Sequence, residues 1–303
     1  MRRPTRRDVL RLAAAGGALA VTPGTAAAGP MRTRPIPATG EALPVVGLGT
    51  WQQFDVPADS PRVADLRKVL RILFEAGGSV IDTSPMYGAA EARLGDLLTN
   101  MDAHDTAFLA TKVWTRGEAA GIERMERSLD KLETDSVALM QVHNLVDAKT
   151  HMATLKAWKA AGRIRYTGIT HYTEGALDDL AAFLRRDPPD FLQLGYNMAM
   201  RAAADTVLPL AADAGVAVLV NQPYDSGRLF RKVEGRDLPE WARDFCDSWG
   251  QFFLKYLLAT DGVTAVIPGT DDPEHMRDNA GAGRGRLPDE TERRRMRRLV
   301  AEL

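Results

Sequence analysis

Short apolar runs alternate along most of the chain with segments in which apolar residues recur three or four positions apart. A short apolar run predicts a buried strand, whereas recurrence at three and four predicts a helix with one apolar face. Strands are expected at residues 45–49, 79–82, 106–112, 136–143, 163–170, 191–197, 216–221 and 263–268. Helices are expected around residues 63–73, 91–98, 122–132, 152–158, 177–184, 205–214 and 249–259, with a last helix from about residue 289.

Eight strand–helix repeats in about 270 residues favour an α/β protein of a single domain, a (β/α)₈ TIM barrel at residues 31–303. A doubly wound open sheet would need fewer strands or a second domain. Its glycine-rich fingerprint is also missing after the first strand, because Gly47-Leu48-Gly49 is followed by Thr50 and Trp51. A barrel places its site at the C-terminal ends of the strands, so polar residues there are the candidates for chemistry.

The composition is that of an ordinary soluble globular protein, with 303 residues, 45% hydrophobic and 26% charged, and a net charge of −1. The near-zero charge argues against nucleic acid as the main partner. The arginine-rich stretch at residues 284–298 lies in a helical tail that also contains glutamates, which indicates a solvated helix face. The single cysteine, Cys246, permits neither an intrachain disulfide nor a paired-cysteine metal site, and we expect an inert thiol.

The first 30 residues have the three parts of a twin-arginine signal peptide. Arg6 and Arg7 lie in a charged start, residues 12–21 form a short apolar run, and residues 26–28 are alanines suited to a cleavage site. The alternative is a chance arginine pair before an alanine-rich tail. The apolar run is too short to span a bilayer, so no stable membrane span is expected after cleavage. The pattern predicts recognition by the twin-arginine export machinery and a periplasmic or extracellular location.

Polar residues follow the apolar runs at the face where a barrel carries its site. Asp82 ends the second expected strand, and Tyr87 lies in the Pro/Gly loop after it. Lys112 ends the third strand and His143 ends the fourth. Any one of them could be an ordinary strand terminator, but four such groups on three consecutive strands predict one pocket. Later strands end in Thr170, His171, Gln193, Asn197 and Asn221.

From about residue 43 to residue 279 the chain resembles the aldo-keto reductases. The landmarks agree in order and strand position: G-L-G-T-W at 47–51, D-T-S-P-M-Y-G at 82–88, T-K at 111–112, V-H at 142–143, G-I-T at 168–170, Q-L-G-Y-N at 193–197 and I-P-G-T at 267–270. By this resemblance Asp82, Tyr87, Lys112 and His143 match the family's catalytic tetrad. The resemblance also implies reduction of carbonyl compounds with a nicotinamide cofactor, usually NADPH, and without a metal.

The chemistry of these four side chains agrees with that reading. A free tyrosine has a pKa of about 10, too high for ready proton donation near neutrality. A close Lys112 ammonium is expected to lower the pKa of the Tyr87 phenol, and Asp82 would hold Lys112 in place as its ion pair. His143 would orient the carbonyl oxygen while Tyr87 delivers the proton, and Lys112 and His143 would stabilise the negative charge that grows on that oxygen.

The resemblance implies a cofactor site along the ends of the strands. Asn221 stands where the family often stacks an aromatic ring on the nicotinamide, and Tyr224 lies three positions further on. At the phosphate end the matching basic residue is His275, and Asp271 and Asp272 would repel a 2′-phosphate. NADPH is therefore the first expectation, and NADH stays open. The expected cofactor-binding residues are Gly49, Thr50, Trp51, Asp82, Thr170, His171, Gln193, Asn221, Pro223, Pro268, Gly269, Thr270, His275 and Asn279.

Trp51, Tyr87, Trp114 and His143 are expected to contact the substrate, and the excursion at residues 224–248 is expected to help form the pocket. The leading hypothesis is an exported NAD(P)H-dependent reductase of an aldehyde or ketone, a small-molecule carbonyl substrate. The alternative is an exported cofactor-binding barrel with a regulatory or partner-binding role and little turnover. A metal-dependent hydrolase is disfavoured, because the five histidines form neither a His-x-His nor a His-Glu-x-x-His pattern.

Overall fold

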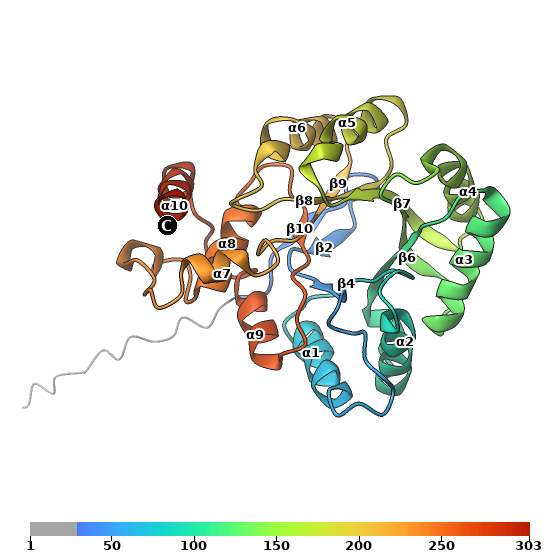
Figure 1. The fold of residues 1–303 in the computed structure, drawn as a ribbon, viewed down its shortest axis with the longest axis horizontal. Helices are drawn as coiled ribbons and strands as arrows, with labels where there is room; N and C mark the ends of the chain where they lie inside the picture. Colours follow the sequence, from blue (N-terminus) through green and yellow to red (C-terminus); the bar gives the residue numbers. More distant parts are fainter. Residues whose placement is uncertain (1–28) are drawn as a thin grey trace, which may run out of the picture.

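Eight parallel strands follow one another in chain order around a closed barrel (Figure 1). The computed structural model describes residues 29–303. Parallel bridges from Val46 to Val266 and from Gly49 to Gly269 join the last strand to the first, so the sheet has no open edge. The predicted (β/α)₈ barrel is confirmed. Its strands are β3 (Leu48–Gly49), β4 (Val80–Asp82), β5 (Phe108–Val113), β6 (Val137–His143), β7 (Ile164–His171), β8 (Phe191–Gly195), β9 (Ala217–Asn221) and β10 (Ala265–Val266).

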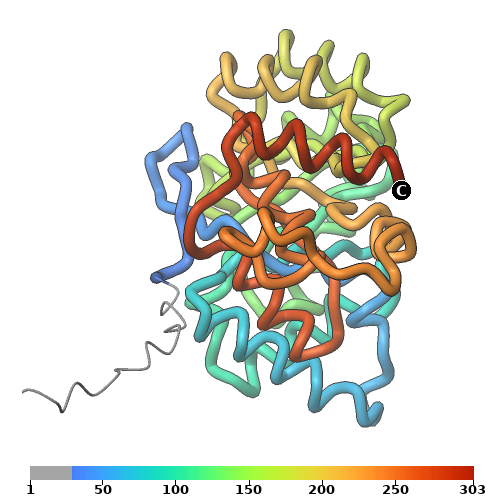
Figure 2. The backbone as a smooth tube through the Cα atoms, turned by 90° about the vertical axis from the view of Figure 1, so that its left-hand side faces the viewer, coloured from blue at the N-terminus to red at the C-terminus, as the bar shows by residue number. Residues whose placement is uncertain are grey.

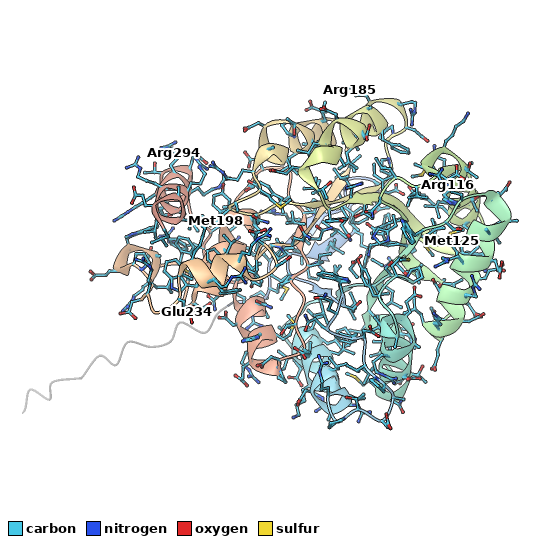
Figure 3. All side chains as sticks on the ribbon, viewed as in Figure 1. Arg116, Met125, Arg185, Met198, Glu234 and Arg294 are labelled. Atoms are coloured by element: carbon cyan, nitrogen blue, oxygen red, sulfur yellow. The ribbon has the colours of Figure 1, made fainter. Side chains whose placement is uncertain are left out.

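Helices surround the barrel (Figure 1), and buried apolar side chains from them belong to the main hydrophobic core. Leu66 and Leu70 of α1 are fully buried, as their spacing of four residues predicts. Figure 3 shows the polar side of the helices, with Arg185 and Arg294 at the periphery of the molecule. Met125, by contrast, is fully buried. The helices are α1 (Val63–Glu75), α2 (Ala90–Met101), α3 (Glu118–Lys131), α4 (Ala148–Ala160), α5 (Leu177–Arg186), α6 (Val207–Asp213), α7 (Arg228–Lys232), α8 (Trp249–Leu258), α9 (Pro273–Gly281) and α10 (Glu290–Glu302).

A short antiparallel hairpin before the barrel was not expected from the sequence. It pairs β1 (Thr33–Pro35) with β2 (Ala42–Pro44), and Figure 2 shows it in blue at the left edge of the molecule. Ile36 and Leu43 from the hairpin pack with Phe108, Tyr166 and other residues of the barrel interior. The hairpin therefore closes one end of the barrel. Strands of three residues bounded by prolines carry too little alternation for a periodicity argument to detect.

The C-terminal third contains two helices that periodicity alone did not indicate. The short helix α7 lies within the excursion at residues 224–248, and α9 follows β10 directly. The sequence did carry a start signal for α9, because the Asp272 side chain caps the helix and Pro273 occupies its first turn. The last helix begins where it was predicted, with Asp289 as N-cap in a capping box with Glu292.

Two further expectations concern the N-terminal segment, with its relation to a membrane, and the single cysteine. The signal-peptide prediction lies outside the described residues and stays a prediction. Within residues 29–303, no helix is long and apolar enough to cross a membrane. Cys246 is buried, and burial raises the pKa of its thiol to about 12, which keeps the unreactive protonated form at neutral pH.

Candidate active site

A buried ion pair lies at the centre of the C-terminal face of the barrel. Lys112 is fully buried, and its Nζ donates hydrogen bonds to Asp82 Oδ2 and to the Thr83 carbonyl oxygen, both at 2.7 Å. The other carboxylate oxygen of Asp82 accepts from Gln193 Nε2 at 2.7 Å and from Gln141 Nε2 at 3.1 Å. Because both oxygens of the carboxylate are engaged, Asp82 and Lys112 are held in one geometry.

The alternation of side chains along the strands produces this arrangement. Side chains two positions apart on a strand share a face, and Val80, Ala110, Phe191 and other apolar residues fill the barrel interior. Two residues further along the same strands, the inward positions become polar. The resulting layer contains Asp82, Lys112, Gln141, Thr170, Gln193 and Asn221. The apolar barrel core therefore ends in a polar floor at the C-terminal face.

Tyr87 and His143 lie over this floor. Their rings meet edge to face with centroids 6.3 Å apart, and Lys112 Nζ lies 5.0 Å from the centroid of the Tyr87 ring. Burial raises the pKa of the Tyr87 phenol above its ordinary value; the Lys112 charge offsets part of this rise and the Asp82 charge adds to it. The expected lowering of this pKa by Lys112 is present, but the desolvation of the phenolate outweighs the nearby ammonium, so the net pKa is raised. Tyr87 therefore keeps its proton throughout the neutral range.

The charges of the neighbouring groups are also determined by burial and by the ion pair. Burial alone would lower the pKa of the Lys112 ammonium, but Asp82 and Tyr87 outweigh it and hold that pKa above its ordinary value. Burial, the Lys112 charge and His171 lower the pKa of His143 to about 3. At neutral pH the site thus contains a charged lysine, a protonated phenol and a neutral imidazole.

A cavity of about 760 Å³ opens above these groups. Twelve of the residues expected from the sequence line it: Gly49, Thr50, Trp51, Asp82, Tyr87, Trp114, His143, Thr170, Gln193, Asn221, Pro223 and Gly269. Lys112 belongs to the same polar layer but is fully buried and does not line the cavity; it contacts the lining residues Asp82 and Tyr87. Five expected cofactor contacts do not line it, namely His171, Pro268, Thr270, His275 and Asn279. The cavity therefore unites the tetrad and the middle of the expected cofactor site.

The residues outside the cavity have other contacts in this structure. His171 is half-buried and stacks on Tyr172 with ring centroids 5.7 Å apart. His275 is exposed on α9, and its Nδ1 lies 4.0 Å from Asp272 Oδ2. Asn279 is buried and accepts a hydrogen bond from the Tyr224 hydroxyl. His275 and Asn279 thus lie on α9 and do not line the cavity, although Asn279 bonds to its wall through Tyr224.

The polar floor fits an aromatic ring that carries an amide. The Asn221 side chain donates to Gln193 Oε1 at 3.2 Å, while its own Oδ1 is buried with no partner among residues 29–303. Thr170 Oγ1 donates to the same Gln193 oxygen at 3.1 Å. An unpaired buried acceptor is costly, and an amide N–H of a bound group would satisfy it. Tyr224, three positions after Asn221, also lines the cavity and packs on Phe230 with ring centroids 4.8 Å apart.

The sequence profile of the Aldo/keto reductase family matches residues 45–296. The chain belongs to the aldo/keto reductase family. The methylglyoxal reductase YeaE of Escherichia coli is 28% identical over 248 residues, which is 79% of this chain and 85% of that protein. The aldo-keto reductase YhdN of Bacillus subtilis is 28% identical over 221 residues, 66% of each chain. These matches confirm the expectation of an enzyme of this family.

A solved structure supports the same fold. The aldo-keto reductase of Klebsiella pneumoniae in complex with NADPH superimposes with a TM-score of 0.76 at 25% identity. The superposition covers 89% of this chain and 95% of the Klebsiella chain. The barrel and its C-terminal face therefore correspond to those of a family member that binds a nicotinamide cofactor.

Several polar residues of this reductase site were not identified from the sequence, and three of them lie beside the tetrad. Gln141 donates to Asp82, Asn144 lines the cavity beside His143, and Ser84 contacts the His143 ring. Gln141 had a signal, since an isolated polar residue two positions before His143 on a buried strand faces the same side. Ser84 and Asn144 lie in loops, whose conformation periodicity does not predict. Within residues 29–303, no three His, Cys, Asp or Glu side chains gather as a metal site would require.

Proposed function

We propose that this chain reduces an aldehyde or ketone to an alcohol with a hydride from NADPH, NADH being the second possibility. The observation that carries the proposal is the buried Asp82–Lys112 pair beneath Tyr87 and His143, at the floor of a cavity in a barrel of this family. When bound, the nicotinamide cofactor supplies the hydride that the carbonyl carbon receives. The protein must supply position, a proton and a field that stabilises negative charge.

The Tyr87 phenol is the proton source that the geometry favours. Lys112 already donates to Asp82 and to the Thr83 carbonyl, and the pKa of its ammonium is raised. His143 is neutral, because the pKa of its imidazolium is lowered to about 3. A neutral imidazole N–H can donate a hydrogen bond but is a much weaker acid than a phenol. Tyr87 would therefore give its proton to the carbonyl oxygen as negative charge grows there.

Each remaining tetrad residue then has a distinct duty. Lys112, with its Nζ 5.0 Å from the Tyr87 ring centroid, stabilises the phenolate that Tyr87 becomes. Asp82 keeps Lys112 charged and fixed. His143 lines the cavity beside Trp114, with ring centroids 6.4 Å apart, where it can donate to the carbonyl oxygen. None of these duties requires a metal.

The cavity mouth favours a neutral substrate with an apolar or aromatic body. The exposed large hydrophobic side chains of residues 29–303 all line this cavity: Trp51, Met86, Trp114, Tyr172 and Phe230. A cluster of exposed hydrophobic side chains around a cavity is typical of a ligand-binding surface. Asp82 is the one charged residue among the described lining side chains, so nothing there pairs with a substrate carboxylate. Methylglyoxal, named for the YeaE relative, is a smaller comparison substrate.

The choice between NADPH and NADH depends on the region around α9. Two arginines of this region are already paired, Arg62 with Asp271 and Arg277 with Glu274. A 2′-phosphate would have to compete with these carboxylates for a cation. The NADPH complex of the Klebsiella relative supports NADPH. Fluorescence titration of the purified protein with each cofactor measures the preference directly.

A turnover assay separates reduction from the alternative of a cofactor-binding protein. Mass spectrometry of the purified protein would identify any retained cofactor, and a nitrobenzaldehyde with excess NADPH would then be added. Many NADPH molecules oxidised per protein would support the reductase. Oxidation of one equivalent followed by arrest would favour the regulatory role, and no oxidation with any tested carbonyl compound would contradict the proposed reaction.

Export by the twin-arginine route is a separate proposal. It is supported by the sequence pattern of residues 1–30 alone. Residues 1–35 fused to a reporter should direct export, and replacing Arg6 and Arg7 together with lysine should abolish it. Export that survives the double replacement would contradict this route.

A further inference from the structure

A serine hydroxyl contacts the ring of His143 from the buried side. Ser84 lies two residues after β4 and is fully buried, and its Oγ is 3.3 Å from His143 Nδ1. The same oxygen accepts a hydrogen bond from the Met86 backbone N–H at 3.3 Å. A hydroxyl has one proton to donate and two lone pairs with which to accept. Since Met86 uses an accepting position, the Ser84 proton is available for Nδ1.

His143 can use that proton, because its ring is neutral. Half-buried beside a charged lysine, a protonated imidazole would be repelled by Lys112 and poorly solvated. A neutral imidazole carries its one proton on either Nδ1 or Nε2, and the partner of one nitrogen decides the state of the other. Ser84 is the hydrogen-bond partner of Nδ1, and no group within residues 29–303 bonds to Nε2.

The opposite tautomer fits the contacts less well. With the proton on Nδ1, Ser84 Oγ would accept from both His143 and Met86, and its own proton would have no acceptor among the described residues. A buried donor without an acceptor is unfavourable. Nε2 would then present a lone pair to the cavity, where it would repel a carbonyl oxygen.

We propose that Ser84 is a positioning residue: its hydroxyl donates to Nδ1 and so places the His143 proton on Nε2, facing the substrate carbonyl oxygen. The inference rests on the proposed carbonyl reduction for its consequence in turnover. Its structural part, the tautomer of His143, is independent of any reaction. The consequence follows because a donor at Nε2 gains strength as negative charge develops on the oxygen.

Loss of the Ser84 hydroxyl should affect turnover more than substrate binding. The His143 hydrogen bond strengthens in the transition state, so its misplacement lowers kcat while KM changes little. An ordinary hydrogen bond corresponds to roughly a five- to tenfold effect, and we expect Ser84→Ala to lower kcat by about that factor. Ser84→Thr keeps a hydroxyl and should restore kcat if its methyl group fits. Ser84→Cys, with a weaker donor, should be intermediate.

Nitrogen NMR of the full-length chain tests the tautomer directly. Protein with ¹⁵N-labelled histidine is saturated with NADP⁺, and long-range proton–nitrogen spectra show which ring nitrogen carries the proton. The His143→Gln variant assigns the signals of His143 among the five histidines. We expect wild-type His143 to be protonated on Nε2 alone, and Ser84→Ala to show a mixture of the two forms.

The outcomes separate this inference from the proposed reaction. A wild-type His143 protonated on Nδ1 would overturn the inference, even if Ser84→Ala failed to fold. So would a Ser84→Ala protein that keeps one Nε2–H form and the wild-type kcat. If wild-type protein reduced no carbonyl compound, the proposed reaction would fail, and the nitrogen spectrum would still decide the role of Ser84.

Discussion

Replacing Tyr87 with phenylalanine removes one hydroxyl from the cavity and keeps the ring. The edge-to-face contact with His143, at a centroid distance of 6.3 Å, does not involve the hydroxyl and should remain. The ion pair beneath should also remain, because Lys112 and Asp82 are held by Thr83, Gln141 and Gln193. The substitution therefore isolates the proton that Tyr87 is proposed to deliver.

The expected loss of turnover follows from the lack of a substitute donor. A positioned general acid contributes about 10²- to 10⁴-fold, which corresponds to roughly 2.7–5.4 kcal/mol of activation free energy. Lys112 donates to Asp82 and Thr83 and the pKa of its ammonium is raised, which opposes loss of a proton, and the neutral His143 ring is a far weaker acid than a phenol. Because neither neighbour can replace the phenol, we expect kcat to fall toward the upper end of that range.

Steady-state oxidation of NADPH with an aromatic aldehyde measures kcat, and fluorescence titration measures cofactor affinity in the same samples. Tyr166→Phe is a matched control, because that hydroxyl bonds to Thr39 and Glu41 at the opposite end of the barrel. It should lower stability by about 1 kcal/mol and leave kcat unchanged. A Tyr87→Phe protein with more than a tenth of wild-type kcat would refute the assignment of Tyr87 as the acid.

Three further changes test the surroundings of the site. Lys112→Met should lower kcat at least 100-fold and the free energy of unfolding by about 3–5 kcal/mol, since it leaves Asp82 buried without its counterion. In urea denaturation the double variant Asp82→Leu/Lys112→Met should be more stable than Lys112→Met. Equal or lower stability of the double variant would show that the unpaired Asp82 charge is not the cause of the loss. The pKa of His143 is lowered from 6.5 to about 3, so on acidification the unfolded chain binds a proton at this histidine before the folded chain does. The free energy of unfolding of the wild type should therefore fall relative to that of His143→Gln as pH drops from about 6.5 toward 3. Parallel curves of unfolding free energy against pH for the two proteins would count against a neutral His143. A Cβ at Gly121 would lie 2.5 Å from the His151 ring, so Gly121→Ala should lower the melting temperature through about 1–3 kcal/mol of strain. Gly175→Ala, with open space around it, should leave the melting temperature unchanged. Equal melting temperatures for the two variants would show that the His151 ring moves freely.

The raised pKa of Tyr87 changes how the tetrad is understood. From the sequence, Lys112 was expected to lower the pKa of the Tyr87 phenol. The buried position holds the phenol protonated instead, with Lys112 offsetting only part of the cost of ionisation. In the proposed reaction the lysine acts chiefly at the moment of proton transfer, when the departing proton would leave a negative oxygen near the Lys112 charge.

The barrel and most of the floor of the site could be predicted from the sequence alone. Apolar runs of strand length and helical stripes repeat eight times, and burial of those stripes permits few other folds. Because the C-terminal ends of the strands in a barrel meet at one face, the sequence was enough to place Asp82, Lys112 and His143 together. The family resemblance then supplied their roles, and the profile match at residues 45–296 confirmed the family.

Contacts between segments distant in the chain could be read only from the folded molecule. It showed the hairpin of β1 and β2 closing the barrel, and placed His275 and Asn279 outside the cavity. It showed that burial outweighs the Lys112 charge in the pKa of Tyr87, because burial is a property of the packed molecule. It also brought Ser84 to His143, 59 residues away, through loops whose conformations no periodic pattern describes. Spacing along a strand predicts which face a side chain occupies, but distance and desolvation arise only when the elements pack.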